Sequence, residues 1–141
     1  MVVYFDTSAF LPMLIPESGS GPSKEIWEQA DDITSTRLMY VEAVAAVSRI
    51  THSGRSTSGR ESKFVGSLNQ KWRRLKIIEL EAGLMVDAAA CSFRFGLRGY
   101  DAVHCAAAAL VNGPDLVAAS SDRRLLEAWS ELGVATFDPR G

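Results

Sequence analysis

Short apolar runs recur along this chain and predict its strands. Val2, Val3, Tyr4 and Phe5 form the first run. Their β-branched and aromatic side chains, followed abruptly by polar residues, are typical of a buried strand. The same reasoning predicts four more short strands, within residues 31–36, 77–80, 116–119 and 134–137.

Helices are expected between these strands. Apolar residues at helical spacing predict them at residues 8–15, 24–30, 38–50, 61–75, 81–95, 100–111 and 123–132. Residues 17–22 are expected to form a loop, with Ser23 as the N-cap of the helix that follows, and residues 51–60 a flexible turn. The alternation predicts an α/β sandwich around a mostly parallel sheet of about five short strands, in one domain over residues 1–141.

The helix expected at 38–50 contains an isolated acid. From residue 38 to residue 48 only Glu42 is charged, and the helix is apolar nearly all round. We therefore expect its carboxylate to be partly buried, which is costly unless it is paired or binds a cation. A solvated face or a salt bridge to a neighbouring Arg is the alternative.

Three more acids occupy comparable settings. Asp6 directly follows the first strand and precedes Thr7 and Ser8, and Asp122 follows another strand together with Ser120 and Ser121. Ligands bind at the carboxyl ends of the strands in an open parallel sheet. The remaining acid, Asp101, is the single acid of the helix at 100–111, in its first turn, with His104 one turn along.

Four carboxylates that converge at one sheet edge repel one another. A hard divalent cation with oxygen ligands, Mg²⁺ or Mn²⁺, is the usual solution, and such a site suits phosphodiester hydrolysis. Each residue also has an ordinary structural explanation. Asp6 and Asp122 have the position of N-caps, Asp101 complements a helix dipole, and His104 fits a packed or hydrogen-bonded core histidine.

Charge is distributed unevenly along the chain. The net charge is −2, yet eight Lys or Arg face a single acid, Glu61, between residues 49 and 76. That segment carries +7, so the rest of the chain carries −9. A basic helical hairpin on an acidic body indicates an arm that faces a polyanion, or else only a solvated helix face.

The cysteines and the hydropathy of the chain indicate the compartment in which the protein is expected. Cys91 and Cys105 lie in apolar helical patterns without metal-ligand spacing, which favours core thiols in a reducing compartment. The N-terminus has no signal-peptide pattern, and no apolar run approaches the ~20 residues of a membrane helix. We expect a cytoplasmic protein without a membrane partner.

Several segments together resemble a known family. DTSAFL at 6–11, the lone Glu42, YDAVHCAAA at 100–108 and SSDRRL at 120–125 are similar to the PIN-domain ribonucleases, more narrowly the VapC toxins of bacterial toxin–antitoxin systems. The match extends over nearly the whole chain in order and spacing.

The resemblance implies a three-layer α/β/α fold and an endoribonuclease that depends on Mg²⁺ or Mn²⁺ and cuts structured RNA such as tRNA or rRNA. Its acidic site would consist of Asp6, Glu42, Asp101 and Asp122, which would serve as catalytic residues and metal ligands. Supporting hydroxyls would come from Thr7, Ser8 and Ser120. Arg73, Arg74, Arg94 and Arg98 would neutralise RNA phosphates.

The resemblance also implies partners. Members usually act as homodimers and are inhibited by a small VapB-type antitoxin, whose C-terminal segment lies in a groove by the acidic site. Here that groove would involve the helices at 38–50 and 61–75. The rival function is a non-catalytic RNA- or protein-binding module on the same fold. A phospho-acceptor domain is disfavoured because Asp6 stands alone before Thr7 and no Lys follows Lys76. A phosphatase with a DxD start fails because Ser8 occupies the second acid position.

Overall fold

A five-stranded sheet forms the centre of the computed structural model, which describes residues 1–53 and 59–141. Its order is β3-β2-β1-β4-β5, and each neighbouring pair runs parallel. The strands are β1 (Val2–Phe5), β2 (Asp32–Thr36), β3 (Leu75–Ile78), β4 (Leu116–Ala119) and β5 (Ala135–Phe137). The first strand of the chain is therefore the central strand, and the carboxyl ends of all five point to the same edge.

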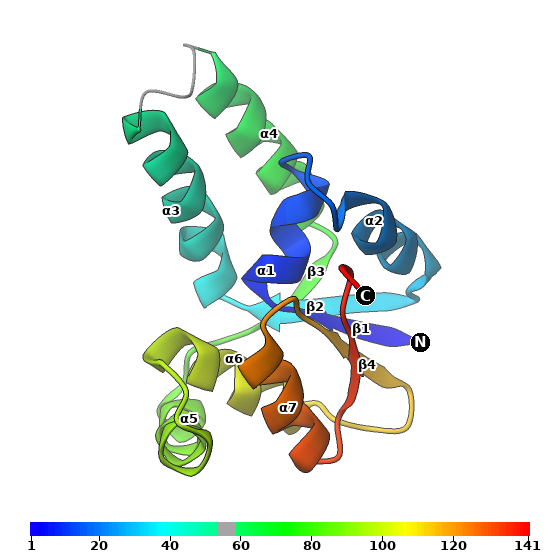
Figure 1. Cartoon of the computed structure of the whole chain (residues 1–141), viewed down its shortest axis with the longest axis vertical. Helices are drawn as coiled ribbons and strands as arrows, with labels where there is room; N and C mark the ends of the chain where they lie inside the picture. Colours follow the sequence, from blue (N-terminus) through cyan, green and yellow to red (C-terminus); the bar gives the residue numbers. More distant parts are fainter. Residues whose placement is uncertain (54–58) are drawn as a thin grey trace.

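Helices cover both faces of this sheet (Figure 1). One face carries α1 (Thr7–Phe10), the short 3-10 helix η1 (Leu11–Met13), α2 (Ser20–Gln29), α3 (Leu38–His52) and α4 (Arg60–Trp72). The other carries α5 (Ala82–Phe95), α6 (Gly99–Leu110) and α7 (Arg123–Glu131). The α/β/α prediction is confirmed, and the sheet is parallel throughout. In the described ranges no helix is long and apolar enough to cross a membrane.

The alternation of side chains along β1 explains the two cores. Val3 and Phe5 point to one face, where Phe5 packs edge-on against Trp27 of α2 with ring centroids 5.6 Å apart. Tyr4 points to the other face and packs against Trp129 of α7, at 5.8 Å. All three β1 side chains are fully buried. Because β1 is fixed from both faces, the residue that follows it, Asp6, starts from a rigid position.

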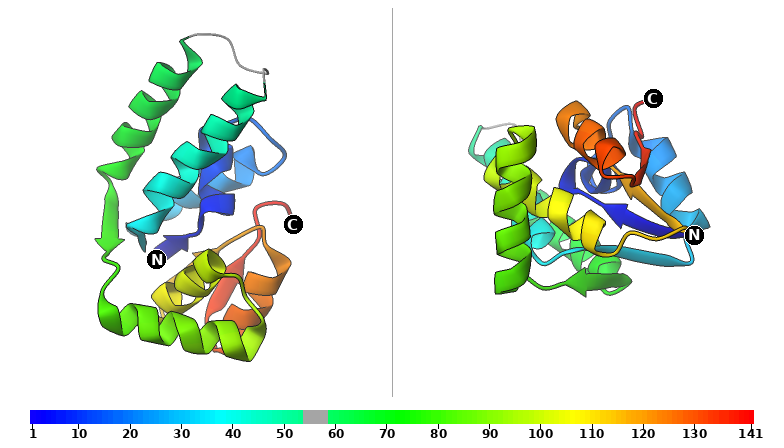
Figure 2. Two further views of the ribbon diagram at one scale, coloured as in Figure 1. Left: turned by 90° about the vertical axis from the view of Figure 1, so that its left-hand side faces the viewer. Right: turned by 90° about the horizontal axis from the view of Figure 1, so that it is seen from below.

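Helices α3 and α4 lie side by side and extend beyond the sheet (Figures 1 and 2). Tyr40 of α3 donates a hydrogen bond of 2.7 Å to the amide oxygen of Asn69 on α4. Its ring also contacts Trp72, with centroids 5.2 Å apart. These contacts lie near the base of the pair, where it joins the sheet. Most of the turn expected at 51–60, namely residues 54–58, lies outside the described residues.

Several expected boundaries were wrong. The helix expected at 8–15 is divided into α1 and the 3-10 helix η1. The helix expected at 61–75 ends at Trp72, and β3 starts at Leu75, two residues early, because Leu75 pairs with Ile33 and is buried in the core. Ser23 is not an N-cap, since α2 already begins at Ser20. The Ser23 hydroxyl instead donates a 2.8 Å hydrogen bond to the carbonyl of Ala9, which joins α2 to α1.

Candidate active site

A cleft of about 670 Å³ opens where β1 and β4 end, between α3 and α6. The four acids that the sequence singles out come from four different elements and all line this cleft. They are Asp6, Glu42, Asp101 and Asp122. Parallel strands place their carboxyl ends at one edge, which is the reason that residues so far apart in the chain meet here.

Asp6 is the most buried of these acids, with 3% of its surface exposed. One carboxylate oxygen caps α1 by accepting the Ala9 N–H at 2.9 Å. The Ser8 hydroxyl donates to the same oxygen at 2.7 Å, and the Ser120 hydroxyl donates to the other at 2.6 Å. Burial raises the pKa of Asp6, although the charge of His104 and these hydrogen bonds oppose the rise. Asp6 is therefore both an N-cap and a wall of the cleft.

The hydroxyls of Ser8 and Ser120 connect the ends of β1 and β4. Besides contacting Asp6, the Ser8 hydroxyl accepts the Ser121 N–H at 2.8 Å. The Ser120 hydroxyl accepts the Asp122 N–H at 2.9 Å. Asp122 in turn caps α7 by accepting the Leu125 N–H at 3.2 Å. This network fixes the relative positions of two acids that are more than a hundred residues apart in sequence.

Glu42 is paired with two side chains. The Thr7 hydroxyl donates to its Oε1 at 2.8 Å, and Nε2 of His104 lies 2.7 Å from the same oxygen. Nδ1 of His104 contacts the Tyr4 hydroxyl at 2.7 Å. Burial lowers the pKa of His104, but its hydrogen bond to Glu42 and the surrounding acids outweigh burial and raise it overall. The partner of Glu42 is thus a histidine rather than an arginine.

Asp101 differs from the other acids in having no hydrogen-bond partner for its side chain among the described residues. It lies in the first turn of α6 and is partly buried. Burial and the negative charge of Asp122 raise its pKa, the charge of His104 opposes the rise, and Asp6 and Glu42 add to it. The cleft therefore concentrates negative charge, and Asp101 experiences that charge without a compensating donor.

The donor chemistry of the cleft fits a hard divalent cation, because carboxylate and hydroxyl oxygens are the ligands that Mg²⁺ and Mn²⁺ prefer. The spacing is wider than the sequence suggests. In residues 1–53 and 59–141 no three His, Cys, Asp or Glu side chains lie close enough together to hold one ion. A metal would thus have to draw side chains of the cleft together.

Residues 3–129 of the chain match the PIN domain family. This chain belongs to the PIN-domain family. It is 36% identical over 124 residues to ribonuclease VapC45 of Mycobacterium tuberculosis, a match that covers 88% of this chain and 86% of the relative. The resemblance to VapC proteins noted from the sequence is thereby confirmed.

Solved structures agree with the fold of this PIN domain. PAE2754 from Pyrobaculum aerophilum superposes with a TM-score of 0.70 at 19% identity, over 99% of this chain and 90% of that one. A toxin–antitoxin complex from Klebsiella pneumoniae gives a TM-score of 0.65 at 14% identity, over 97% of both chains. At such low identity these likenesses establish the fold alone.

The arginines expected to contact RNA are dispersed over the PIN domain. Arg98 lines the acidic cleft, and Arg49 of α3 joins it there. Arg94 stacks on Phe95 at 4.8 Å and borders a different cavity. Arg73 and Arg74 follow α4 at its far end, where the Arg74 guanidinium donates to the Ala30 carbonyl at 3.2 Å and lies over the Trp27 ring. Of the four arginines expected to contact RNA, Arg98 is the one that lines the cleft together with the four acids.

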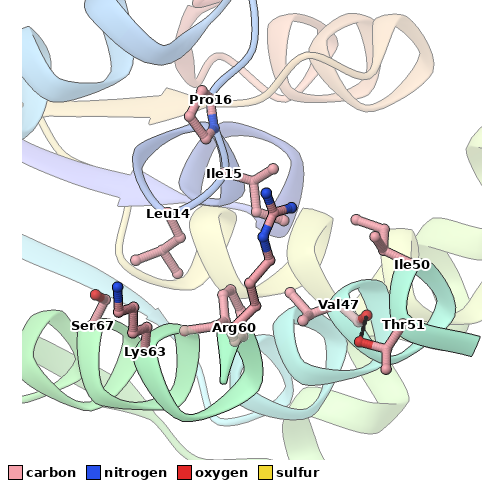
Figure 3. Close-up of a pocket in the computed structure, with 10 residues that line it drawn as sticks. Leu14, Ile15, Pro16, Val47, Ile50, Thr51, Arg60, Lys63 and Ser67 are labelled. Atoms are coloured by element: carbon pink, nitrogen blue, oxygen red, sulfur yellow. Dashed lines mark hydrogen bonds between the residues drawn. The ribbon is translucent and has the colours of Figure 1, made fainter. Parts of the chain in front are cut away.

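A second cavity, of about 310 Å³, lies on the other side of α3 (Figure 3). We call it the apolar groove, and its lining residues are Leu14, Ile15, Pro16, Val47, Ile50, Thr51, Arg60, Lys63, Phe64 and Ser67. Figure 3 shows Leu14, Ile15 and Pro16 on one wall, facing α3 and α4. The Arg60 side chain extends from α4 toward Ile15. The lining thus combines aliphatic side chains with two cationic ones.

Sequence reasoning did not identify Tyr4 or Arg49 as part of the site. Tyr4 belongs to the predicted buried strand, and its ring is buried as expected, but its hydroxyl contacts His104. Arg49 stands out in the sequence only as one charge of the basic segment. The available signal was the helical spacing of Glu42, Ala45, Ala46 and Arg49, which places these residues along one side of α3.

Proposed function

We propose that this PIN domain is a Mg²⁺- or Mn²⁺-dependent endoribonuclease, the toxin of a VapBC-type pair, which hydrolyses phosphodiester bonds in structured cytoplasmic RNA such as tRNA or rRNA. The observation that carries this proposal is the convergence of four carboxylates, from four separate elements, on one cleft. The 36% identity to a protein named as a ribonuclease supports it.

Asp6, Asp101, Asp122 and Glu42 are the residues that would hold the cation. When bound, it would polarise the phosphate, lower the pKa of a bound water and balance charge on the leaving oxygen. Asp101 would contribute most directly, because no hydrogen bond engages its side chain in the described part of the chain. Burial is the main cause of its raised pKa, and the nearby charges of Asp122, Asp6 and Glu42 add repulsion that a divalent cation would relieve.

The remaining residues have distinct tasks. Ser8 and Ser120 keep both oxygens of Asp6 in place. Glu42, held by Thr7, orients the water that attacks in line, and the 3′ oxygen leaves. Arg98 and Arg49, at the border of the cleft, neutralise phosphates of the bound RNA. Loops are the favoured targets because their bases can be splayed out.

The test is cleavage of a pool of structured RNA by the purified protein. Reactions with Mg²⁺, Mn²⁺ or EDTA would be compared for the wild type and Asp6→Asn, which keeps an N-cap side chain at this position. Asp87→Asn, an exposed acid of α5 outside the cleft, is the matched control. We expect discrete cuts that require the metal, persist in the control and disappear in Asp6→Asn.

Binding of RNA without cleavage under all these conditions would favour the non-catalytic binding module instead. The observation that favours this alternative is the wide spacing of the acids, of which no three in the described ranges lie close enough together, as placed, to hold a single ion. Cuts that survive in Asp6→Asn would indicate a contaminating ribonuclease.

We further propose that the apolar groove receives the VapB-type antitoxin. One of the solved structures that shares this fold is a toxin–antitoxin complex, which supports a partner of this kind. Aliphatic walls flanked by Arg60 and Lys63 suit a segment with large apolar side chains and at least one acid. The groove also lies on the pair α3 and α4, which the resemblance implies for the partner, although on the side of α3 away from the acids.

The expected homodimer stays a prediction. Its best candidate surface is α5, where Val86 and Phe93 are 69% and 94% exposed and lie seven residues apart on one face. A self-complementary apolar face of this kind is typical of a two-fold interface.

A further inference from the structure

His104 is a buried polar group for which the proposed chemistry has no task. It lies on α6, one turn after Asp101, and only 1% of its surface is exposed. Both ring nitrogens nevertheless have partners at 2.7 Å, Glu42 on one side and Tyr4 on the other. A histidine with two short hydrogen bonds links the core of the sheet to the wall of the cleft.

The chemistry of Glu42 fixes the direction of these hydrogen bonds. An ionised carboxylate can only accept, so Nε2 of His104 must carry the hydrogen and donate it to Oε1. In the neutral ring Nδ1 then accepts from the Tyr4 hydroxyl. Rotation of the imidazole by half a turn would break both bonds, and therefore one ring orientation is strongly preferred.

Tyr4 provides a rigid anchor for this arrangement. It is the third residue of the central strand β1, is fully buried, and packs edge-on against Trp129. Its phenol can hardly move without disturbing the core. The position of the His104 ring is thereby set by the core, and not by the solvent side of the cleft.

The consequence concerns the two oxygens of Glu42. Oε1 receives two hydrogen bonds, from His104 at 2.7 Å and from Thr7 at 2.8 Å. In the described part of the chain no hydrogen bond engages Oε2. Glutamate has three rotatable side-chain bonds, so a fixed Oε1 greatly restricts where Oε2 can lie.

We propose that His104, anchored by Tyr4, is a positioning residue that holds Oε1 of Glu42 and reserves Oε2 for the cation or the attacking water. This inference rests on the proposed nuclease function. Partners that orient a metal-binding carboxylate typically change metal affinity or activity by 10–100-fold when they are removed. A merely structural histidine would change the stability of the fold without such a selective effect.

Three substitutions test the proposal. His104→Leu replaces the imidazole with an apolar side chain of similar size and so removes the donor to Glu42. His104→Gln keeps an N–H that can reach Glu42, and Tyr4→Phe removes only the anchor hydroxyl. Thermal unfolding and circular dichroism would first establish that each variant is folded. Mn²⁺ binding without RNA, by titration calorimetry, and the Mg²⁺ dependence of cleavage would then be measured.

We expect His104→Leu to weaken Mn²⁺ binding by 10–100-fold and Tyr4→Phe by a few-fold, with His104→Gln within about fivefold of the wild type. In a Glu42→Ala background, His104→Leu should cause little further loss, because the carboxylate that His104 positions is already absent. Additive losses would overturn the proposal, as would a folded His104→Leu protein with wild-type Mn²⁺ affinity. Equal loss in His104→Leu and His104→Gln would also overturn it.

The failure of the nuclease function is a separate outcome. A wild-type protein that neither binds Mn²⁺ nor cuts RNA would reject the proposed function, and the positioning role would fall with it. A wild type that cuts RNA beside an equally active His104→Leu variant would reject the positioning role alone.

Discussion

Helix α3 borders two cavities of opposite character. Its one side contributes Glu42 and Arg49 to the acidic cleft, where buried carboxylates are hydrogen-bonded to hydroxyls and to His104. Its other side contributes Val47 and Ile50 to the apolar groove, whose walls are mainly aliphatic. The same helix thus separates a surface suited to metal and phosphate from one suited to a protein segment.

The difference has a consequence for regulation. A partner that fills the apolar groove would touch the side of α3 opposite Glu42, so it could bind without contacting the acids themselves. In our proposals, cleavage depends on the cleft and partner affinity depends on the groove. Substitutions in one cavity should therefore leave the other intact, and the following predictions test that separation.

The largest expected effect is the loss of cleavage in Asp101→Asn. This change removes the acid without a hydrogen-bond partner, and we expect the cleavage rate to fall by about 1,000-fold. Binding at the groove should stay unchanged. The probe is a panel of fluorescent ten-residue peptides in which Leu, Ile and Phe alternate with Asp and Glu. Near-normal cleavage by the folded variant would show that Asp101 is not part of the catalytic site.

The converse change is Ile15→Asp in the groove. A carboxylate there would replace part of an aliphatic wall, pair with the nearby Arg60 guanidinium and repel an acidic peptide, so peptide affinity should fall about 30-fold, equivalent to about 2 kcal/mol. Cleavage should stay within about twofold. Leu110→Asp, at a residue 62% exposed and outside both cavities, is the matched control. Equal loss of cleavage and peptide binding would show that the two cavities are coupled.

A smaller effect is expected for the arginines. Arg98→Ala should weaken RNA binding about fivefold near 0.1 M salt and reduce the slope of log affinity against log salt by about 0.8. Arg94→Ala, which removes the same charge outside the cleft, should change both less. Filter binding would be performed in the Asp101→Asn background to prevent cleavage. An equal effect of both substitutions would indicate that bound RNA also contacts the protein outside the cleft.

The smallest effect concerns stability. Folding raises the pKa of Asp101 above its ordinary value of 3.8, so ionisation of this carboxyl destabilises the folded protein. Relative to Asp101→Asn, the wild type should lose stability as the pH rises from 3.8 through the folded pKa, and the difference should then level off. We expect at most about 1 kcal/mol, since solvent screens this partly buried group. Urea unfolding between pH 3.5 and 7 would measure it, and a wild type more stable than the variant at pH 7 would contradict it.

The local pattern of apolar and polar residues was sufficient to predict much of the fold of this protein. The runs and helical spacings predicted each strand and helix of the described chain, with errors at boundaries such as the one between α4 and β3. There the polar residues before Leu75 extended a helical pattern, and only pairing with Ile33 on β2 decided that Leu75 belongs to a strand. The sequence also identified the four acids and their hydroxyl neighbours, because strand ends, helix starts and a lone acid in an apolar helix are local signals.

Only the tertiary structure decided which side chains become partners. Tyr4 and His104 are 100 residues apart and Ser8 and Ser121 are 113 apart, and no spacing in the sequence links either pair. Parallel strands whose carboxyl ends share one edge bring such distant residues within hydrogen-bonding distance. Because these groups are buried, the loss of any one hydrogen bond would be costly. The apolar groove has the same origin, since its walls come from three separate segments that meet only when α3 and α4 pack beside η1.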